Sequence, residues 1–150
     1  MDELRIVQLI KEMVAEELRL MGDPCVAAAS VVRKTLLAAF HGADAEDTPP
    51  ARVIEDAVKG AMTALLLADH SMTRGSILVV EAVVDVAAKL DLDPTDSMRA
   101  ALKGLADLQR FVDPSRIDDI RLEIAAHYMG AGEVFVEYLR EMRVVKVGKH

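Results

Sequence analysis

The sequence predicts an all-α protein, a compact bundle of six or seven helices in a single domain that spans residues 1–150. Two observations predict this class. Apolar residues recur every three or four positions along most of the chain, which is the period of an amphipathic helix. In addition, four dipeptides place a capping residue directly before a proline, a combination that starts a helix. These dipeptides are Asp23-Pro24, Thr48-Pro49, Asp93-Pro94 and Asp113-Pro114.

The composition is that of a globular protein, with 52% apolar and 29% charged residues. Because aromatic residues make up only 3%, the core has to be built from small and aliphatic side chains, which let helices approach closely. The net charge of −7 disfavours a nucleic-acid partner, since an acidic surface lacks the attraction to phosphates that dominates such binding.

The sequence also bears on the compartment. The first residues lack the basic and apolar regions of a secretory signal, and no uncharged apolar run approaches the roughly 18 residues that cross a bilayer. A single cysteine, Cys25, cannot form an internal disulfide. We therefore expect a cytoplasmic protein with no membrane partner, in which Cys25 is a buried and inert thiol.

Three helices are expected in the first half of the chain. The first has one apolar stripe and stops at a glycine, Gly22. The second is apolar on nearly all sides, so it is either central or covered by a partner. The third starts at one of two adjacent prolines and carries a face of small residues. The expected ranges are 2–21, 24–41 and 49–69.

The fourth helix is the one element whose composition also resembles a strand. Residues 77–84 are rich in Val and Ile, but the polar residues of this stretch fall at spacings of four. On a helix they make one polar line, whereas on a strand they would share a face with apolar residues. We therefore predict a turn at 70–75 and a helix at 76–90. The polar line consists of Glu81, Asp85 and Lys89.

Three further helices follow, separated by Asp113-Pro114 and by two glycines, Gly130 and Gly132, which end or kink a helix. The expected ranges are 94–112, 114–129 and 133–145. The final residues are basic, and we expect them to form a solvated helix end and tail. The basic residues there are Arg140, Arg143, Lys146 and Lys149, against one acidic residue, Glu141.

The polar line supports two interpretations. The first is a buried ion-pair network, because two like charges on an apolar helix need a partner. Candidate partners are Arg33, Lys34 and Arg99. The second is a metal site between the fourth and sixth helices, since carboxylates and a histidine one turn apart can share a metal. Its ligands would be Glu81, Asp85, Glu123 and His127.

Two classes of function remain open at this stage. The excess of apolar surface on the second and fourth helices favours a non-enzymatic assembly module completed by a homodimer. The polar line favours a bundle that binds a metal or a small molecule, and that class includes enzymes. No catalytic residue and no cofactor can be named, because the motifs of nucleophilic catalysis and of phosphate binding do not occur in the sequence.

Overall fold

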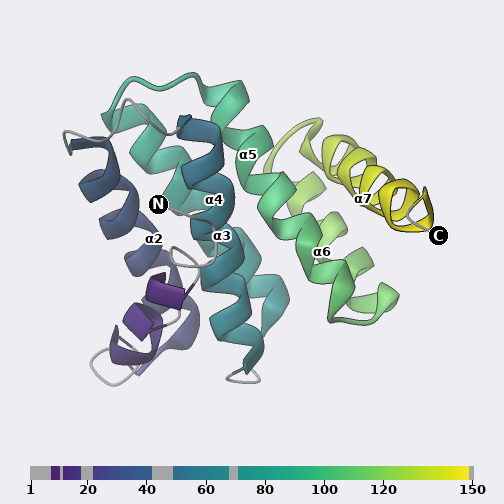
Figure 1. Cartoon of the computed structure of the whole chain (residues 1–150), viewed down its shortest axis with the longest axis horizontal. Helices are drawn as coiled ribbons and strands as arrows, with labels where there is room; N and C mark the ends of the chain where they lie inside the picture. The colour runs from purple at the N-terminus through teal and green to yellow at the C-terminus, as the bar shows by residue number, and fades with distance from the viewer. Residues whose placement is uncertain (1–7, 11, 18–21, 42–48, 68–70, 149–150) are drawn as a thin grey trace.

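The computed structural model describes residues 8–10, 12–17, 22–41, 49–67 and 71–148, and within these residues it is all α-helical with no strand (Figure 1). The predicted fold class is therefore confirmed, including the helical state of residues 77–84. The predicted first helix is described only at 8–10 and 12–17, which are helical. The remaining elements are α2 (Pro24–His41), α3 (Pro50–Leu67), α4 (Met72–Lys89), α5 (Pro94–Ala106), the short 3-10 helix η2 (Asp107–Arg110), α6 (Pro114–His127) and α7 (Ala131–Gly148).

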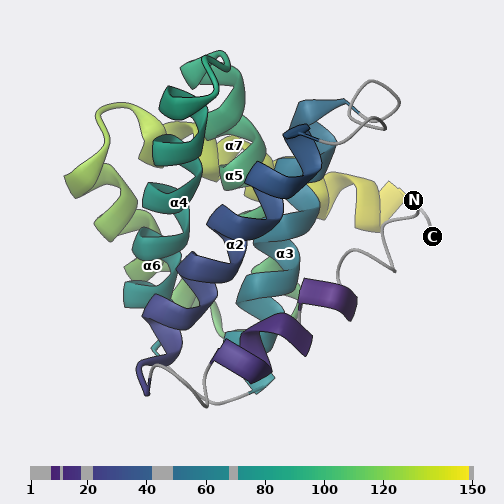
Figure 2. The ribbon, with the colours of Figure 1, turned by 90° about the vertical axis from the view of Figure 1, so that its left-hand side faces the viewer.

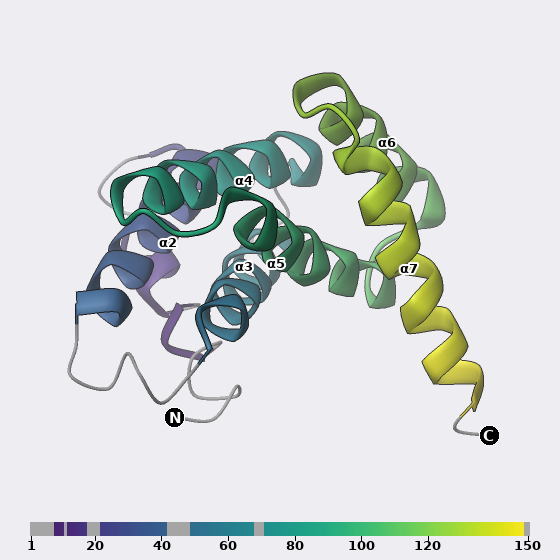
Figure 3. The ribbon, with the colours of Figure 1, turned by 90° about the horizontal axis from the view of Figure 1, so that it is seen from above.

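The described helices form two groups. Helices α2, α3, α4 and α5 pack against one another, and we call them the inner bundle (Figure 2). Helices α6 and α7 form a helical hairpin, in which α6 lies against α4 and α7 lies against α5 (Figure 3). A short loop around η2 leads from the inner bundle into this hairpin.

The apolar residues of α2 and α4 are mostly buried inside this single chain. Each of the two helices packs against the other and against α3. Among the large apolar side chains of α2 and α4, the exposed ones are Val26 at 36% and Val84 at 37%. The core as a whole is built from Ala, Val, Ile and Leu, and the one fully buried aromatic side chain of the described residues is Phe135 of α7.

The predicted turn at 70–75 and the predicted start of α4 at Ser76 are wrong. Helix α4 begins at Met72, after Ser71, whose hydroxyl accepts a hydrogen bond from the Arg74 amide at 3.4 Å. Gly75 lies inside the helix because no side chain fits there. A Cβ atom at this position would lie 2.5 Å from Cδ1 of Leu65 on α3. The glycine thus permits close helix packing and does not mark a turn.

The proline-marked helix starts are confirmed at Pro24, Pro94 and Pro114, but the expected side-chain caps are only partly present. Asp23 accepts hydrogen bonds from the amides of Cys25 and Val26, at 3.1 and 3.3 Å. Asp93 accepts one from the amide of Asp96 at 2.9 Å. Asp113 makes no such bond, and Thr48 lies outside the described residues.

The ends of the later helices differ from the prediction. Helix α5 ends at Ala106, earlier than the predicted residue 112, because the chain tightens into η2. The predicted break near the two glycines is confirmed, although α7 begins at Ala131 and extends to Gly148. Gly130 has a φ of +79°, a conformation that glycine adopts without steric cost, so it lets α6 turn directly into α7.

Candidate functional site

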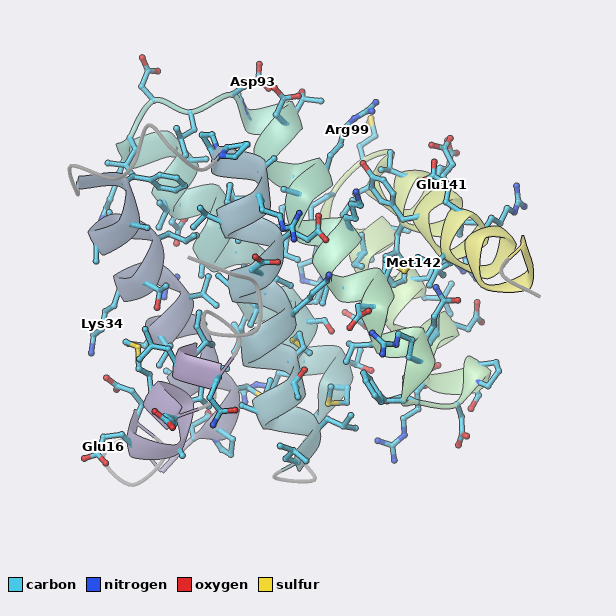
Figure 4. All side chains as sticks on the ribbon, viewed as in Figure 1. Glu16, Lys34, Asp93, Arg99, Glu141 and Met142 are labelled. Atoms are coloured by element: carbon cyan, nitrogen blue, oxygen red, sulfur yellow. The ribbon has the colours of Figure 1, made fainter. Side chains whose placement is uncertain are left out.

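The polar line on α4 is joined to α2 by an ion pair. Nη2 of Arg33 donates to Oδ2 of Asp85 at 2.9 Å, which confirms one of the three predicted partners. Lys34 pairs with a glutamate of the N-terminal helix, and Arg99 lies on α5 (Figure 4). The predicted burial of the network is wrong, because the two side chains are 40% and 55% exposed. An ion pair this exposed contributes less than about 1 kcal/mol to stability.

Tyr128, which follows the last residue of α6, lies beside the same polar line. Burial raises the pKa of its phenol, and the negative charges of Glu81 and Asp85 raise it further. The hydroxyl therefore stays protonated at neutral pH. This placement supports the prediction that the polar side of α4 lies close to α6.

The remaining two predicted ligands, Glu123 and His127, form a local pair on α6. The Nδ1 atom of His127 lies 2.9 Å from the backbone carbonyl oxygen of Glu123 and 3.7 Å from its carboxylate. Because a carbonyl oxygen only accepts, this geometry assigns the proton to Nδ1. Both side chains are exposed, as expected for an ordinary pair one helical turn apart.

Three of the four predicted ligands are thus engaged in two separate ion pairs. Asp85 is engaged with Arg33, and Glu123 is engaged with His127. In the part of the chain that the structure describes, no group of three or more His, Cys, Asp or Glu side chains lies close enough to hold a metal ion. The metal site therefore stays a prediction and does not enter the function proposed below.

The outer face of α6 carries apolar side chains that folding leaves exposed. Helix α6 buries Ile117, Ile120 and Ile124 on its inner side, as their spacing predicts. Leu122 is 52% exposed and Met129, in the turn to α7, is fully exposed. Positions 122, 125 and 126 share one side of the helix by their spacing. We call this surface the hairpin patch; it consists of Leu122, Ala125, Ala126 and Met129.

A hollow of about 260 Å³ adjoins the hairpin patch between α6 and α7. Three of its six lining residues are alanine or glycine. A Cβ atom on Gly132 would lie 2.9 Å from Cβ of Ala125, so the two helices approach closely only because position 132 is glycine. The hollow is lined by Arg121, Ala125, Gly130, Gly132, Glu133 and Val136.

The charges around the hairpin patch are mainly negative. Arg121 is neutralised by Asp118, with 2.7 Å between Nη2 and Oδ1. Asp119 and Glu133 are exposed. Three carboxylates therefore face one guanidinium around the patch and the hollow. The surface therefore combines an apolar strip with an acidic margin.

Sequence reasoning missed this surface. The helical spacing places Ile117, Ile120 and Ile124 on one side of α6, and Leu122 lies outside that stripe. The available signal was an apolar leucine on the side of α6 that also carries Asp118 and Asp119.

A second polar constellation lies where the first turns of α2 and α4 meet. Arg74 donates to both carboxylate oxygens of Asp23, at 3.0 and 2.9 Å, and these bonds hold the pKa of Asp23 at about 2. Burial raises the pKa of the Cys25 thiol, which donates to the backbone oxygen of Ser71 at 3.5 Å. The thiol is buried and protonated, as predicted, so this constellation joins two helices.

A third group of charges links α3 to α5. Glu55 lies between two lysines, with Lys59 at 3.1 Å and Lys103 at 3.8 Å. The carboxylate of Asp56, which is buried, lies 3.5 Å from Nε of Arg52. These pairs satisfy charges that the packing of α3 partly removes from water, so their role is structural.

Comparisons with known proteins do not add to this picture. No model of a protein family matches the chain, and neither a curated protein nor a solved structure matches it. Within the described residues, no helix combines the length and the apolar character that a bilayer span requires.

Proposed function

We propose that this protein is a non-enzymatic interaction module that binds a protein partner through the hairpin patch and the adjoining hollow. The observation that carries the proposal is the exposure of Leu122 and Met129 beside a hollow between α6 and α7. Exposed apolar groups rimmed by charges are typical of protein-binding surfaces.

The same observation argues against a small-molecule site as the main use of this surface. Pockets for drug-sized ligands enclose about 300–1,000 Å³ and have mostly apolar walls. The hollow encloses about 260 Å³ and has Arg121 and Glu133 in its lining. Its size and polarity suit one or two side chains of a docked helix better than a buried ligand.

The proposed interface lies on a different surface from the one that the sequence favoured. The sequence favoured an interface on α2 and α4, because both helices are apolar on nearly all sides. The inner bundle covers most of those residues, and Val26 and Val84 are the large exposed apolar ones on these two helices. The hairpin, in contrast, leaves Leu122 and Met129 uncovered.

The experiment that tests the proposal compares two equally exposed apolar residues. Leu122→Asp places a charge in the hairpin patch, whereas Phe111→Asp places one beside η2, and the two native side chains are 52% and 53% exposed. The native chain and both variants are immobilised, and the proteins retained from an extract, including free copies of the chain, are compared.

We expect Leu122→Asp to abolish binding, because burying an unpaired carboxylate opposes association. The Phe111→Asp control should retain binding, and both variants should unfold at the native denaturant midpoint. Equal binding by the native chain and the Leu122→Asp variant would refute the proposal. A native chain that retains nothing at all would refute it as well.

A further inference from the structure

Met129 is the most exposed of the methionines that the structure describes. Its side chain is fully exposed in the turn between α6 and α7, which lies at the outer edge of the molecule (Figure 3). The left-handed conformation of Gly130 shapes this turn, and the amide of Ala131 donates to the carbonyl oxygen of Tyr128 at 3.1 Å. A hydrogen-bonded turn therefore presents the thioether of Met129 to solvent.

The other methionines of the described residues are less accessible to a dissolved reagent. Some are buried in the core, and the rest are half-buried against it. A half-buried sulfur also has contacts within the chain, since the hydroxyl of Thr35 donates to Sδ of Met13 at 3.9 Å. The buried methionines are Met62 and Met72, and the half-buried ones are Met13, Met98 and Met142.

An accessible thioether can be oxidised without any catalytic group of the protein. A peroxide transfers one oxygen atom to the sulfur, so a sulfur–oxygen bond forms while the oxygen–oxygen bond breaks. The sulfur loses two electrons to the peroxide, and hydrogen peroxide leaves as water with both of its protons. The product is a sulfoxide, which turns an apolar side chain into a polar one. Because hydrogen peroxide is uncharged, the acidic margin of the hairpin patch does not oppose its approach.

We propose that Met129 is a modification site that regulates the hairpin patch: a peroxide oxidises its thioether to the sulfoxide, and the oxidised patch no longer binds the protein partner. A sulfoxide opposes association because burial in an apolar contact removes the hydrogen bonds that its oxygen makes with water. This inference rests on the proposed function, since it names a regulation of the same surface.

The exposure of Met129 also makes the modification compatible with a stable fold and with reversal. Oxidation of a core methionine such as Met62 would place a polar group among packed apolar side chains. Met129 is surrounded by solvent in the folded chain, so its oxidation should leave the free energy of unfolding nearly unchanged. The same exposure gives methionine sulfoxide reductases access to the sulfoxide, which they return to the thioether.

The first arm of the test measures where oxidation occurs. The free native chain is treated with hydrogen peroxide for increasing times, and peptide mass spectrometry measures the sulfoxide at each methionine. We expect Met129 to be oxidised about tenfold or more faster than the other described methionines, because reactivity follows exposure. Urea unfolding of the chain at that stage should give the native midpoint. Oxidation of Met129 no faster than that of the half-buried methionines would overturn the inference.

The second arm measures binding by the immobilised chain. The native chain, a Met129→Leu variant and a Met98→Leu control are each compared with their own untreated sample, and the peroxide is removed before an extract is added. We expect oxidation to weaken binding about tenfold or more in the native chain and in the control, as burial of an unsatisfied polar group requires. Oxidation should leave Met129→Leu at its own starting level, because leucine has no sulfur to oxidise.

Two further measurements separate the sulfoxide from other effects of peroxide. Met129→Gln introduces a polar side chain of similar length and should weaken binding without any oxidant. Incubation of the oxidised native chain with the two methionine sulfoxide reductases, one for each epimer, should restore its binding.

Three results of the binding arm would overturn the inference. An oxidised native chain that binds like the untreated one, while Leu122→Asp loses binding, removes the regulation and leaves the proposed function standing. An equal loss of binding on oxidation of Met129→Leu places the sensitive group elsewhere. A native chain that retains no protein before oxidation refutes the proposed function and this regulation together.

Discussion

The inner bundle and the α6–α7 hairpin use their apolar residues differently. In the inner bundle, α2 and α4 bury most of their apolar side chains, and glycines at positions 75 and 104 bring helices into direct contact. In the hairpin, α6 buries three isoleucines and leaves Leu122 on the opposite side. The inner bundle also leaves large apolar side chains exposed, at Val26, Leu67 and Val84, whereas in the hairpin the exposed Leu122 and Met129 lie beside a hollow.

This difference separates stability from interaction within one chain. Substitutions at the contacts of the inner bundle, or at the residue that anchors the hairpin, should change the free energy of unfolding. Substitutions in the hairpin patch should change binding and leave that free energy nearly unchanged.

The largest effect is expected at the anchor of the hairpin. Phe135→Ala removes a fully buried aromatic side chain and should lower the free energy of unfolding by about 3–5 kcal/mol. Leu122→Ala, on the exposed side of the same hairpin, should change it by less than about 0.5 kcal/mol. Urea unfolding of both variants measures the contrast. A similar cost for the two would mean that the hairpin patch is part of the core.

A smaller effect is expected where α5 approaches α3. The Cβ of Gly104→Ala would lie 2.7 Å from the backbone oxygen of Glu55 and 2.9 Å from Cβ of Val58. Backbone atoms cannot yield easily, so we expect a loss of about 2 kcal/mol from overpacking.

Gly132→Ala is the matched substitution in the hairpin. Its new Cβ would lie 2.9 Å from Cβ of Ala125, but the nearest backbone oxygen would be 3.6 Å away, against 2.7 Å at Gly104. The gain in helix propensity, up to about 1 kcal/mol, is available to alanine at both positions. The net loss for Gly132→Ala should therefore be smaller than for Gly104→Ala, and the reverse order in thermal or urea unfolding would contradict the packing described for α3 and α5.

Substitutions of Gly130, in the turn between α6 and α7, should change the free energy of unfolding through backbone conformation alone. Gly130 has a φ of +79° and open space around its Cβ position. Gly130→Ala should cost about 1 kcal/mol, because a Cβ disfavours the left-handed region. Gly130→Asn should cost less, since asparagine tolerates that region better. Equal unfolding free energies for the two variants would argue against the turn as described.

The smallest effect is expected at the junction of α2 and α4. The pKa of Asp23 is about 2 in the folded chain, against an ordinary 3.8. Its pairing with Arg74 therefore stabilises the fold fully above a pH of about 4, and this contribution is lost as the pH falls toward 2. Asp23→Asn should remove that part of the acid sensitivity. Parallel pH profiles for the native chain and the variant would show that the pair contributes nothing.

Much of the fold could be predicted from the sequence, because local signals determine it. Proline-marked starts located α2, α5 and α6, and the spacing of polar residues identified α4 as a helix. The predicted turn at 70–75 is wrong because a glycine in a turn and a glycine at a helix contact, such as Gly75, look alike in sequence. The difference depends on Leu65 of α3, a contact that no local pattern contains.

The candidate site could be predicted only in part. The pairing of Asp85 with Arg33 follows from charge, and the structure confirms it. The exposure of this ion pair cannot be predicted from charge, because burial depends on how other parts of the chain cover α2 and α4. The hairpin patch was missed because apolar residues were assigned to the core by spacing, and only the packing of α6 shows which side of the helix remains uncovered.

Site-specific photo-crosslinking tests the central claim most directly, because it reports contact whatever the partner is. A photoreactive amino acid is placed at position 122 in one version of the chain and at position 111 in another, inside cells that make the protein. We predict a discrete crosslinked product from position 122, with a mass that identifies the partner, and none from position 111. A product from position 111 with none from position 122 would contradict the assignment of the hairpin patch as the interaction surface.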